Sequence, residues 1–262
     1  MGIHPTAIVD PKAEIHDTAE IHPFAIIGPH VRIGARTVVG PHCVIDGRTV
    51  IGEDNRIFSG AQVGVVSQDM KHAPDMYGRC ELGNGNIVRE HVTISAATMS
   101  GPDDAERVTA IGNQCLFMAY SHVAHDCTVG DRVWMANCVS LAGHVTVEEN
   151  AIIGGLVGVH QDVTVGAFSF LGGMSRVAQD SPPFMIIEGN PARCCGPNTV
   201  GLKRNGFDEA ARKRIKQLHR IMNRSGLNTS QALDTIEQTV EASPERERFV
   251  NFYRQSKRGV TR

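Results

Sequence analysis

The sequence predicts a mainly β protein, a parallel β-helix of hexapeptide repeats followed by a C-terminal α-helical domain. The first observation is an apolar, nearly always aliphatic, residue at every sixth position, unbroken from Ile111 to Val177 and present over most of the first 94 residues. The second is a small or β-branched residue four positions later, as at Ala19, Thr37 and Val133. A period of six fits neither a helix nor an ordinary strand, whereas hexapeptide repeats build a parallel β-helix.

The coil is expected to occupy residues 1–181. Two segments interrupt the repeat, residues 65–81 and 96–110, and both carry polar and charged side chains together with Pro74 or Pro102. We expect these segments to leave the coil as loops. Insertions in a repeat protein tend to lie on its binding face, so the loops also indicate where a ligand binds.

Residues 182–262 are expected to form an extended exit segment and then a helical domain. Helices are predicted from Asp208, as N-cap, to about Asn223, and from near Thr229. A third is predicted from Ser243, a cap that is followed by proline at the first helical position. Such a domain would also protect the open end of the coil from edge-to-edge pairing.

Composition argues against several classes of function. A net charge of -2 gives no electrostatic support for nucleic-acid binding. No apolar run is long enough to span a bilayer and no signal peptide is evident, so we expect a cytoplasmic protein without membrane insertion. The seven cysteines form no C-x-x-C pair, which fits a reducing compartment.

The repeat also predicts which distant residues are neighbours. With three hexads per turn, residue n lies beside residue n+18, at the strand spacing of about 4.8 Å. This offset gives the polar run from Tyr120 to Cys127 its neighbours on the next turns. His125 stacks on Gly143 and Gln161, and Asp126 stacks on His144 and Asp162. His122 stacks on Ser140, and His160 lies over Ala142. Four histidines, a carboxylate and a glycine amide are expected to converge on one patch.

That combination suits general-base acyl transfer. An imidazole accepts a proton from a hydroxyl near neutral pH, and a carboxylate orients the ring and stabilises its cation. A glycine N–H can face the developing oxyanion without steric hindrance. The residues leave open whether Asp126 reaches His125 of its own chain or a histidine of a neighbouring chain.

Several runs together resemble one family, the acyl-carrier-protein-dependent UDP-N-acetylglucosamine O-acyltransferases. They are His122-Val-Ala-His125-Asp126-Cys127, Leu141-Ala-Gly-His144, Val159-His160-Gln161 and the tail Gly201-Leu202-Lys203-Arg204, within a likeness that covers essentially all 262 residues. The resemblance implies a left-handed coil, a homotrimer and active sites between subunits. It also implies transfer of a 3-hydroxyacyl chain from acyl carrier protein to the 3-hydroxyl of UDP-N-acetylglucosamine, or a close UDP-sugar, in lipid A biosynthesis.

The resemblance also implies roles for individual residues. His125 is the expected general base, Asp126 its supporting acid and Gly143 the oxyanion amide. Substrate contacts are expected at Gln68, Lys71, His122, His144, Gly155, His160, Gln161, Asn198 and Arg204, with Gly173 linked to acyl-chain length. The carrier-protein thioester is the co-substrate, and no metal or other cofactor is expected.

A basic segment supports a carrier-protein partner independently of the resemblance. Eight lysines and arginines lie between Lys203 and Arg224, against two acidic residues. Acyl carrier proteins are acidic, so a basic helix on a near-neutral protein is a suitable docking surface. The residues expected to contribute are Arg212, Lys213, Lys216 and Arg220. The other interpretation of this segment is a solvated helix face.

The sequence departs from the family at several positions. Four single positions differ: this chain has Val65 and Val200 where the family usually has Glu, Pro191 where it has His, and Asn205 where it has Arg. Asp162 replaces an aromatic residue, and the run from Ser95 to Thr98 replaces His-Arg-Gly-Thr. The catalytic core is intact while ligand-contacting positions have changed. The reaction type is therefore better supported than the exact sugar, and a divergent paralogue fits these changes.

Three alternatives stay open. Gly189-Asn190-Pro191-Ala192 resembles a segment of acetyl- or acyl-CoA-dependent sugar-nucleotide transferases on the same scaffold. His122, His125 and His144 could bind zinc, as in trimeric β-helix enzymes of the γ-carbonic anhydrase type. A non-catalytic scaffold that binds partners through its flat faces is the third alternative.

Overall fold

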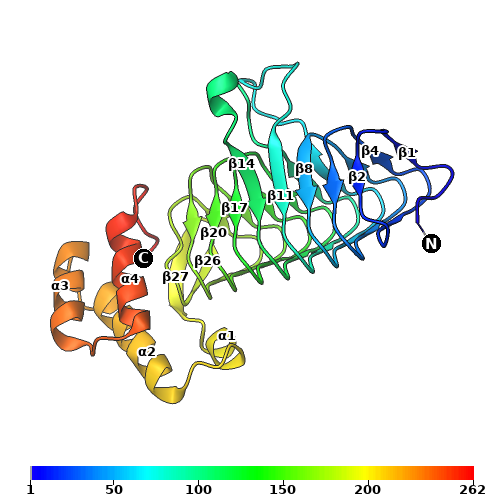
Figure 1. Ribbon diagram of the computed structural model, residues 1–262. Coiled ribbons are helices and arrows are strands. Elements are labelled where there is room, and N and C mark those ends of the chain that lie inside the picture. The colour runs from blue at the N-terminus through cyan, green and yellow to red at the C-terminus, as the bar shows by residue number, and fades with distance from the viewer. Residues whose placement is uncertain (1) are drawn as a thin grey trace.

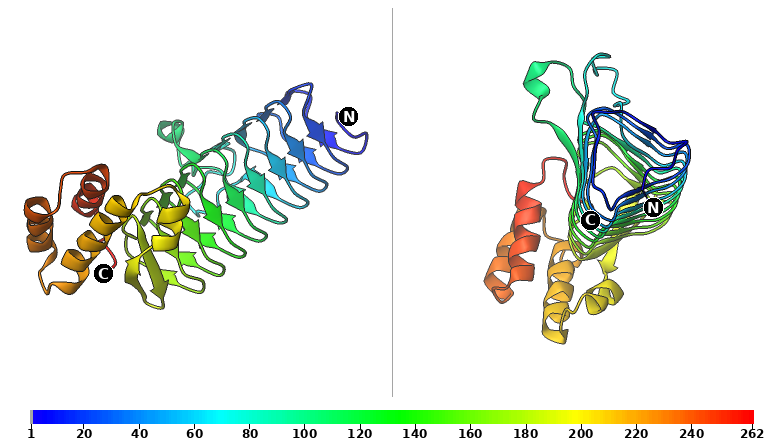
Figure 2. Two further views of the ribbon diagram at one scale, coloured as in Figure 1. Left: turned by 90° about the horizontal axis from the view of Figure 1, so that it is seen from below. Right: turned by 45° about the vertical axis from the view of Figure 1, so that its right-hand side comes forward.

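The computed structural model describes residues 2–262, and its coil has three flat faces, seen end-on in Figure 2. Each face is one parallel sheet of short strands, one strand per turn. Face 1 contains β1 (Ile8–Val9), β4 (Ile26–Ile27), β7 (Val44–Ile45), β10 (Gln62–Val65), β13 (Thr93–Ser95), β16 (His122–Val123), β19 (Ser140–Leu141), β22 (Gly158–Val159) and β25 (Arg176–Val177).

The other two faces follow the same pattern. Face 2 contains β2 (Glu14–Ile15), β5 (Arg32–Ile33), β8 (Arg48–Ile51), β11 (Arg79–Leu82), β14 (Val108–Ile111), β17 (Thr128–Val129), β20 (Thr146–Val147) and β23 (Thr164–Val165). Face 3 contains β3 (Glu20–Ile21), β6 (Val38–Val39), β9 (Arg56–Ile57), β12 (Ile87–Val88), β15 (Leu116–Phe117), β18 (Trp134–Met135), β21 (Ile152–Ile153), β24 (Phe170–Leu171), β26 (Met185–Gly189) and the antiparallel β27 (Ala192–Pro197).

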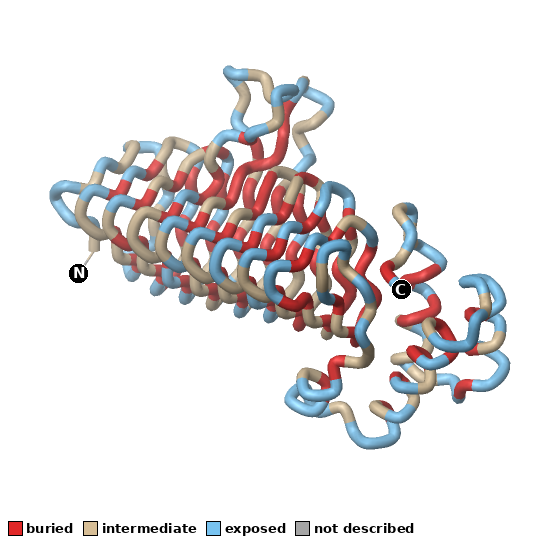
Figure 3. The backbone as a smooth tube through the Cα atoms, turned by 180° about the vertical axis from the view of Figure 1, so that it is seen from behind, coloured by how far each residue is buried: buried red, intermediate tan, exposed pale blue. Residues whose placement is uncertain are grey.

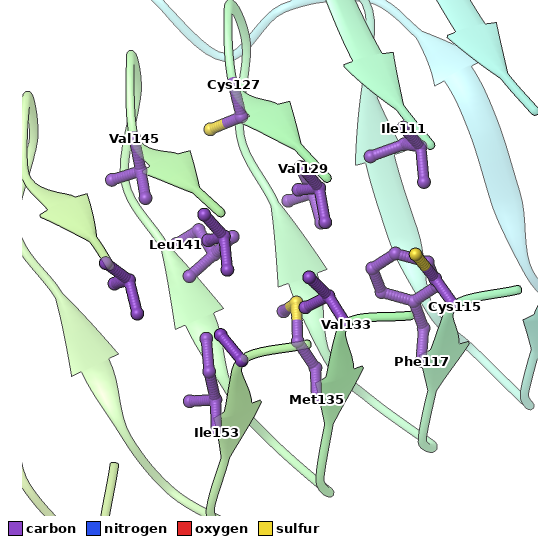
Figure 4. Close-up of a cluster of buried hydrophobic side chains, with 14 of the residues drawn as sticks. Ile111, Cys115, Phe117, Cys127, Val129, Val133, Met135, Leu141, Val145 and Ile153 are labelled. Carbon is purple, nitrogen blue, oxygen red and sulfur yellow. The ribbon is translucent and has the colours of Figure 1, made fainter. Parts of the chain in front are cut away.

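The repeat exists because the second residue of each short strand points into a narrow core. Val129, Met135 and Leu141, one from each face, are buried and meet there (Figure 4). The small residue of each hexad, such as Cys127 or Val133, fills the corner. Full burial of such aliphatic side chains contributes about 1.5–3 kcal/mol each, which explains why the six-residue period is so regular.

The predicted offset of eighteen residues is confirmed where the coil is regular. His122 pairs with Ser140, and Ser140 pairs with Gly158. The two insertions change the offset, because Gln62 pairs with Thr93 and Thr93 with His122.

Both loops leave the coil at the corner between faces 1 and 2 (Figure 1). Residues 66–78 connect β10 to β11, and residues 96–107 connect β13 to β14. The second loop contains the short 3₁₀ helix η1 (Pro102–Asp104). One turn further along the coil, the same corner carries His125 and Asp126, so the loops adjoin the predicted catalytic patch.

The exit segment forms a hairpin, since β26 continues face 3 and β27 pairs with β26 in the antiparallel direction. The short helix α1 (Thr199–Arg204) follows, and neither it nor the hairpin was anticipated as a defined element. The three predicted helices are confirmed, with caps at Asp208 and Ser243: α2 (Glu209–Arg224), α3 (Thr229–Thr239) and α4 (Pro244–Gln255).

The helical domain lies at the C-terminal end of the coil and buries its own apolar side chains (Figure 3). Ile215 and Leu218 of α2 and Phe249 of α4 belong to this buried set. Between residues 2 and 262, no helix is both long and apolar enough to cross a membrane.

Candidate active site

A groove of about 500 Å³ follows face 1 beside the first loop. The residues that line it and carry polar groups include Gln68, Asp69, His122, His125, Ser140, His160 and Arg176. A larger groove, about 1070 Å³, lies on face 2 beneath the loops, but it holds none of the clustered histidines. Its Arg32 and Arg79 are already paired with glutamates, at 3.0 and 2.8 Å. We therefore assign the chemistry to the smaller groove.

His125 is bonded to the carboxylate of its own chain. Its Nδ1 lies 2.8 Å from Oδ2 of Asp126, so this carboxylate reaches the histidine that precedes it in the same chain. Asp126 occupies a corner position with φ of 59°, a left-handed conformation that Asp adopts more readily than most residues. The corner therefore turns the carboxylate back toward the preceding histidine, and Nδ1–H donation to it leaves Nε2 as the acceptor.

Gly143 provides the surface on which the imidazole lies. A Cβ at this position would come within 2.5 Å of Cε1 and 2.6 Å of Nε2 of His125. Only glycine allows the ring to approach the backbone so closely. Within residues 2–262 the Gly143 N–H has no hydrogen-bond acceptor. An unpaired amide beside the base is available to a developing oxyanion.

His144 completes a compact cluster with this pair. Its ring meets the ring of His125 edge-on, with centroids 5.2 Å apart, and its Nε2 lies 3.9 Å from Asp126 Oδ2. His125, Asp126 and His144 each have a ligand atom within 4.8 Å of the others, so this set could hold a metal ion. His122 is outside the set, in contrast to the three-histidine arrangement considered for zinc.

His122 points outward from β16 into the groove, half-buried. Its Nδ1 is 2.7 Å from the hydroxyl of Thr93 on the neighbouring strand. Burial lowers the pKa of His122, so the ring is neutral near pH 7. A neutral imidazole held in this way can hydrogen-bond a sugar hydroxyl.

Asp69 is a site residue that the sequence analysis missed. Its Oδ2 lies 4.0 Å from Nε2 of His125, on the side of the ring opposite Asp126. The backbone N–H of Lys71 donates to its Oδ1 at 2.9 Å and holds the pKa of Asp69 below the ordinary value. The loop has no periodicity, so the only available signal was its position between Gln68 and Lys71. Arg176, which also lines the groove, was missed because an exposed arginine carries no pattern.

The remaining predicted residues fall into two groups. Gln68 and His160 line the groove. Gln161 lies one turn beyond Gly143, because the next residue, Asp162, donates its N–H to the carbonyl of Gly143 at 3.2 Å. The members of the other group do not line the groove in one chain. Lys71 has an exposed side chain, Gly155 and Gly173 lie in the corner between faces 3 and 1, Asn198 caps α1, and Arg204 is exposed at the end of α1.

Comparisons with known proteins agree with this geometry. The model of Udp N-acetylglucosamine O-acyltransferase, domain 2, matches residues 180–261, and the bacterial transferase hexapeptide model matches residues 12–47. An acyl-[acyl-carrier-protein]–UDP-N-acetylglucosamine O-acyltransferase of Gloeothece citriformis is 45% identical over 183 residues, which are 70% of this chain and 64% of that protein.

Solved structures extend the likeness to the whole chain. The UDP-N-acetylglucosamine O-acyltransferase of Moraxella catarrhalis is 39% identical, with a TM-score of 0.94 over 100% of both chains. The UDP-N-acetylglucosamine acyltransferase of Bacteroides fragilis is 37% identical, with a TM-score of 0.94 over 99% of both chains. The chain belongs to the UDP-N-acetylglucosamine O-acyltransferase family. The predicted family and its left-handed β-helix of hexapeptide repeats are thereby confirmed.

Proposed function

We propose that this protein transfers a 3-hydroxyacyl chain from acyl carrier protein to the 3-hydroxyl of UDP-N-acetylglucosamine, or a close UDP-sugar, in lipid A biosynthesis. The observation that carries the proposal is the contact of His125 with Asp126 on one side and with the Gly143 backbone on the other. This geometry brings a proton acceptor and an unpaired amide to one point, which is what attack on a thioester requires.

The reaction follows from these positions. His125 Nε2 accepts the proton of the sugar 3-hydroxyl while the oxygen forms a bond to the thioester carbonyl carbon. The carbonyl oxygen becomes an anion that accepts a hydrogen bond from the Gly143 N–H, and Asp126 stabilises the imidazolium. When the intermediate collapses, the carbon–sulfur bond breaks and the imidazolium returns the proton to the departing thiolate. His125 is then neutral again.

The other polar residues of the groove have binding roles in this proposal. Gln68, His122, His144, His160 and Gln161 would contact the sugar nucleotide. Lys71 extends from the same loop and would neutralise phosphate charge. Gly155 and Gly173 would border the acyl chain at the opposite corner of face 1, where the absence of a side chain at Gly173 leaves room for a longer chain.

A homotrimer is supported by the surface of face 3. Its outward side chains are apolar on the turns that carry the site, and Trp134 remains 49% exposed. The set comprises Leu116, Trp134, Ile152 and Phe170, flanked at the next corner by Tyr120, Leu156 and Met174. One copy can place this apolar surface against face 1 of the next copy, and repetition of such a contact closes a ring.

The same arrangement accounts for the tail residues. Asn198 donates from Nδ2 to the carbonyl of Phe168, at the corner between faces 2 and 3, whereas His125 lies between faces 1 and 2. Asn198 and Arg204 of one chain would therefore contact substrate held at His125 of a neighbour.

The basic surface of α2 fits an acidic carrier protein. Lys213, Lys216 and Arg220 are exposed, while Arg212 is half-buried. Opposite charges across such a surface would accelerate the encounter with acyl carrier protein. A cytoplasmic location stays a prediction from the sequence.

Two of the positions at which this chain differs from the family adjoin each other. These differences could change which sugar is accepted, so the proposal includes a close UDP-sugar. Val65 and Ser95 are register partners at the bases of the two loops. Asn205 caps the end of α1, with its Nδ2 bonded to the carbonyl of Gly201 at 2.8 Å. Paired changes at the bases of the two loops would alter the sugar pocket through the loops while leaving His125 unaltered.

The test combines binding and turnover. Thermal unfolding with a panel of UDP-sugars should show stabilisation by the preferred one, about 2.7 kcal/mol at 100 times its Kd. Transfer from 3-hydroxyacyl carrier protein to that sugar should fall by roughly 10² or more in His125→Ala, as expected for loss of a general base. His16→Ala, at an exposed position in an early coil, is the matched control and should retain full turnover.

Three outcomes would contradict the proposal. Unchanged turnover in His125→Ala would exclude the assigned base. Competition in which acetyl-CoA displaces acyl carrier protein as donor would favour the CoA-dependent alternative. Stoichiometric zinc in the purified protein, together with hydratase activity, would favour the metal enzyme.

A further inference from the structure

The two loops are bonded to each other where they adjoin the groove. The hydroxyls of Ser67 and Thr98 lie 2.7 Å apart, and these residues are only 4% and 2% exposed. Ala73 N–H donates to the carbonyl of Met99 at 2.7 Å, and Met99 N–H donates to Nδ1 of His72 at 3.1 Å. We call residues 66–78 and 96–107 together the loop pair. Its members are held as one unit by these bonds.

One end of the hydroxyl contact reaches the carboxylate of the base. The backbone N–H of Thr98 donates to Asp126 Oδ2 at 3.2 Å, and the same oxygen is 2.8 Å from His125 Nδ1. The Asp126 side chain is 7% exposed, so water has little access to replace a lost donor. The Thr98 N–H thereby helps to fix the direction in which this oxygen faces the imidazole.

The other end reaches the second carboxylate. Ser67 Oγ accepts from the backbone N–H of Asp69 at 3.2 Å, and Asp69 Oδ2 lies 4.0 Å from His125 Nε2. A hydroxyl that accepts from Asp69 can donate its own proton to Thr98. The buried Ser67–Thr98 contact is therefore connected to both carboxylates beside the His125 ring. One is Asp126, at Nδ1, and the other is Asp69, opposite Nε2.

We propose that the Ser67–Thr98 hydroxyl pair is a positioning device for the general base, an inference that rests on the proposed function. By joining the loops, the pair holds the Thr98 N–H against Asp126 and the Asp69 carboxylate opposite Nε2. Asp126 then keeps the proton of His125 on Nδ1 and leaves Nε2 open to the sugar hydroxyl. Neither hydroxyl contacts the reacting atoms.

The test removes each hydroxyl while retaining the backbone. Thr98→Val keeps the N–H and the branched shape, and Ser67→Ala removes the other partner. Each should lower kcat by roughly 10-fold or more, toward the ~100-fold that a 1 Å displacement of a reacting group can cost. The KM for the carrier protein should not change. Thr98→Ser restores the hydroxyl and should restore kcat.

A matched control separates positioning from general stability. Thr37 is also fully buried, and its hydroxyl donates to the carbonyl of Gly52 at 2.8 Å in an early coil. Thr37→Val should leave kcat unchanged whatever its effect on Tm. The double variant Ser67→Ala/Thr98→Val should be no slower than the worse single variant, because the two hydroxyls act as one unit. Additive losses in kcat would overturn the proposal.

A second readout does not depend on turnover. Nitrogen-15 NMR of histidine-labelled protein should show His125 with its proton on Nδ1 in the wild type and a mixture of tautomers in Thr98→Val and Ser67→Ala. An unchanged tautomer in both variants would overturn the positioning proposal. If the tautomer shifts in both variants while the wild-type protein acylates no UDP-sugar, the proposed function is overturned and the positioning role stands.

Discussion

Single residues determine how closely the base approaches the coil, and Gly143 is the clearest example. The His125 ring occupies the space that a Cβ at residue 143 would need. By contrast, a Cβ at Gly158, one turn further along and in the same groove, would meet no atom within 4 Å. The two glycines therefore differ in their surroundings: the imidazole fills the space beside Gly143, whereas the space beside Gly158 is free of protein atoms.

This difference predicts opposite results for the same substitution. Gly143→Ala should displace the imidazole and lower kcat by about 10²-fold, since small displacements of a reacting group are costly. Gly158→Ala should retain kcat within about twofold of the wild type, because its methyl group displaces no protein atom and leaves the imidazole in place. Since the methyl group enters the groove, any effect should fall on the KM for the substrate. Steady-state kinetics of the two variants, with circular dichroism to verify folding, measures the contrast. Equal losses in both would show that the ring does not depend on Gly143.

The same residues show what the sequence could and could not predict. His125, Asp126 and Gly143 were assigned because the coil is regular from residue 111 onward and the offset of eighteen residues is maintained there. Asp69 and Thr98 lie in insertions, where no period relates sequence distance to spatial distance. Their approach to the base depends on how the loops bond to each other, which no sequence pattern records.

Among the elements, helices were easier to predict than the segment before them. Asp208 and Ser243 are caps with side chains that bond the first turn, at 2.7 Å to Ala211 N and 3.3 Å to Arg246 N. The β26–β27 hairpin carries no such signal, because its strands form only against the last turn of face 3. Contacts with the coil determine the structure of the hairpin, and a local sequence pattern does not predict such contacts.

Helix α2 also contains a buried histidine, His219, whose protonation is expected to destabilise the fold. Burial, and secondarily Arg224, lowers the pKa of His219, and within the described residues its Nε2 has no hydrogen-bond partner. The unfolded chain therefore binds a proton more readily than the folded chain. The contribution of neutral His219 to the free energy of unfolding is fully present above the ordinary pKa of about 6.5. It is lost as the pH falls toward the lowered pKa of His219 in the folded chain.

We expect Tm to fall as the pH is lowered below about 6.5, and to fall less steeply in His219→Leu. The Leu side chain keeps the apolar contacts and suits a helix. Thermal unfolding monitored by circular dichroism between pH 5 and pH 8, without ligand, provides the comparison. His16→Leu, an exposed position in an early coil, should leave the pH dependence unchanged. Parallel curves for wild type and His219→Leu would contradict the expectation.

At the scale of the whole molecule, the polar tail and the base lie at different corners of one prism. The Asn198 side chain is bound to Phe168, between faces 2 and 3, while Asp126, His144 and Asp162 form the corner between faces 1 and 2. A single chain would thus contain both halves of the proposed site without bringing them together. The apolar surface of face 3 offers the contact through which a neighbouring copy can supply the missing half.

This division predicts complementation between two inactive variants. His125→Ala lacks the base, and Arg204→Glu lacks the tail cation, so each homotrimer should be nearly inactive. When both are co-expressed in equal amounts with different tags and isolated as mixed trimers, about one third of the sites combine an intact His125 with an intact neighbouring Arg204. Mixed trimers should therefore regain a substantial fraction of wild-type turnover, measured per site.

A trimer of two differently tagged His125→Ala chains is the matched control and should stay inactive. If each site were built from a single chain, every site in the mixed trimer would carry one defect, and turnover would equal the average of the two inactive parents. Recovery above that average therefore depends on sites shared between chains. Because Arg204 lies at the end of α1 and His125 lies in the coil, recovery would also show that α1 of one chain serves the His125 site of its neighbour.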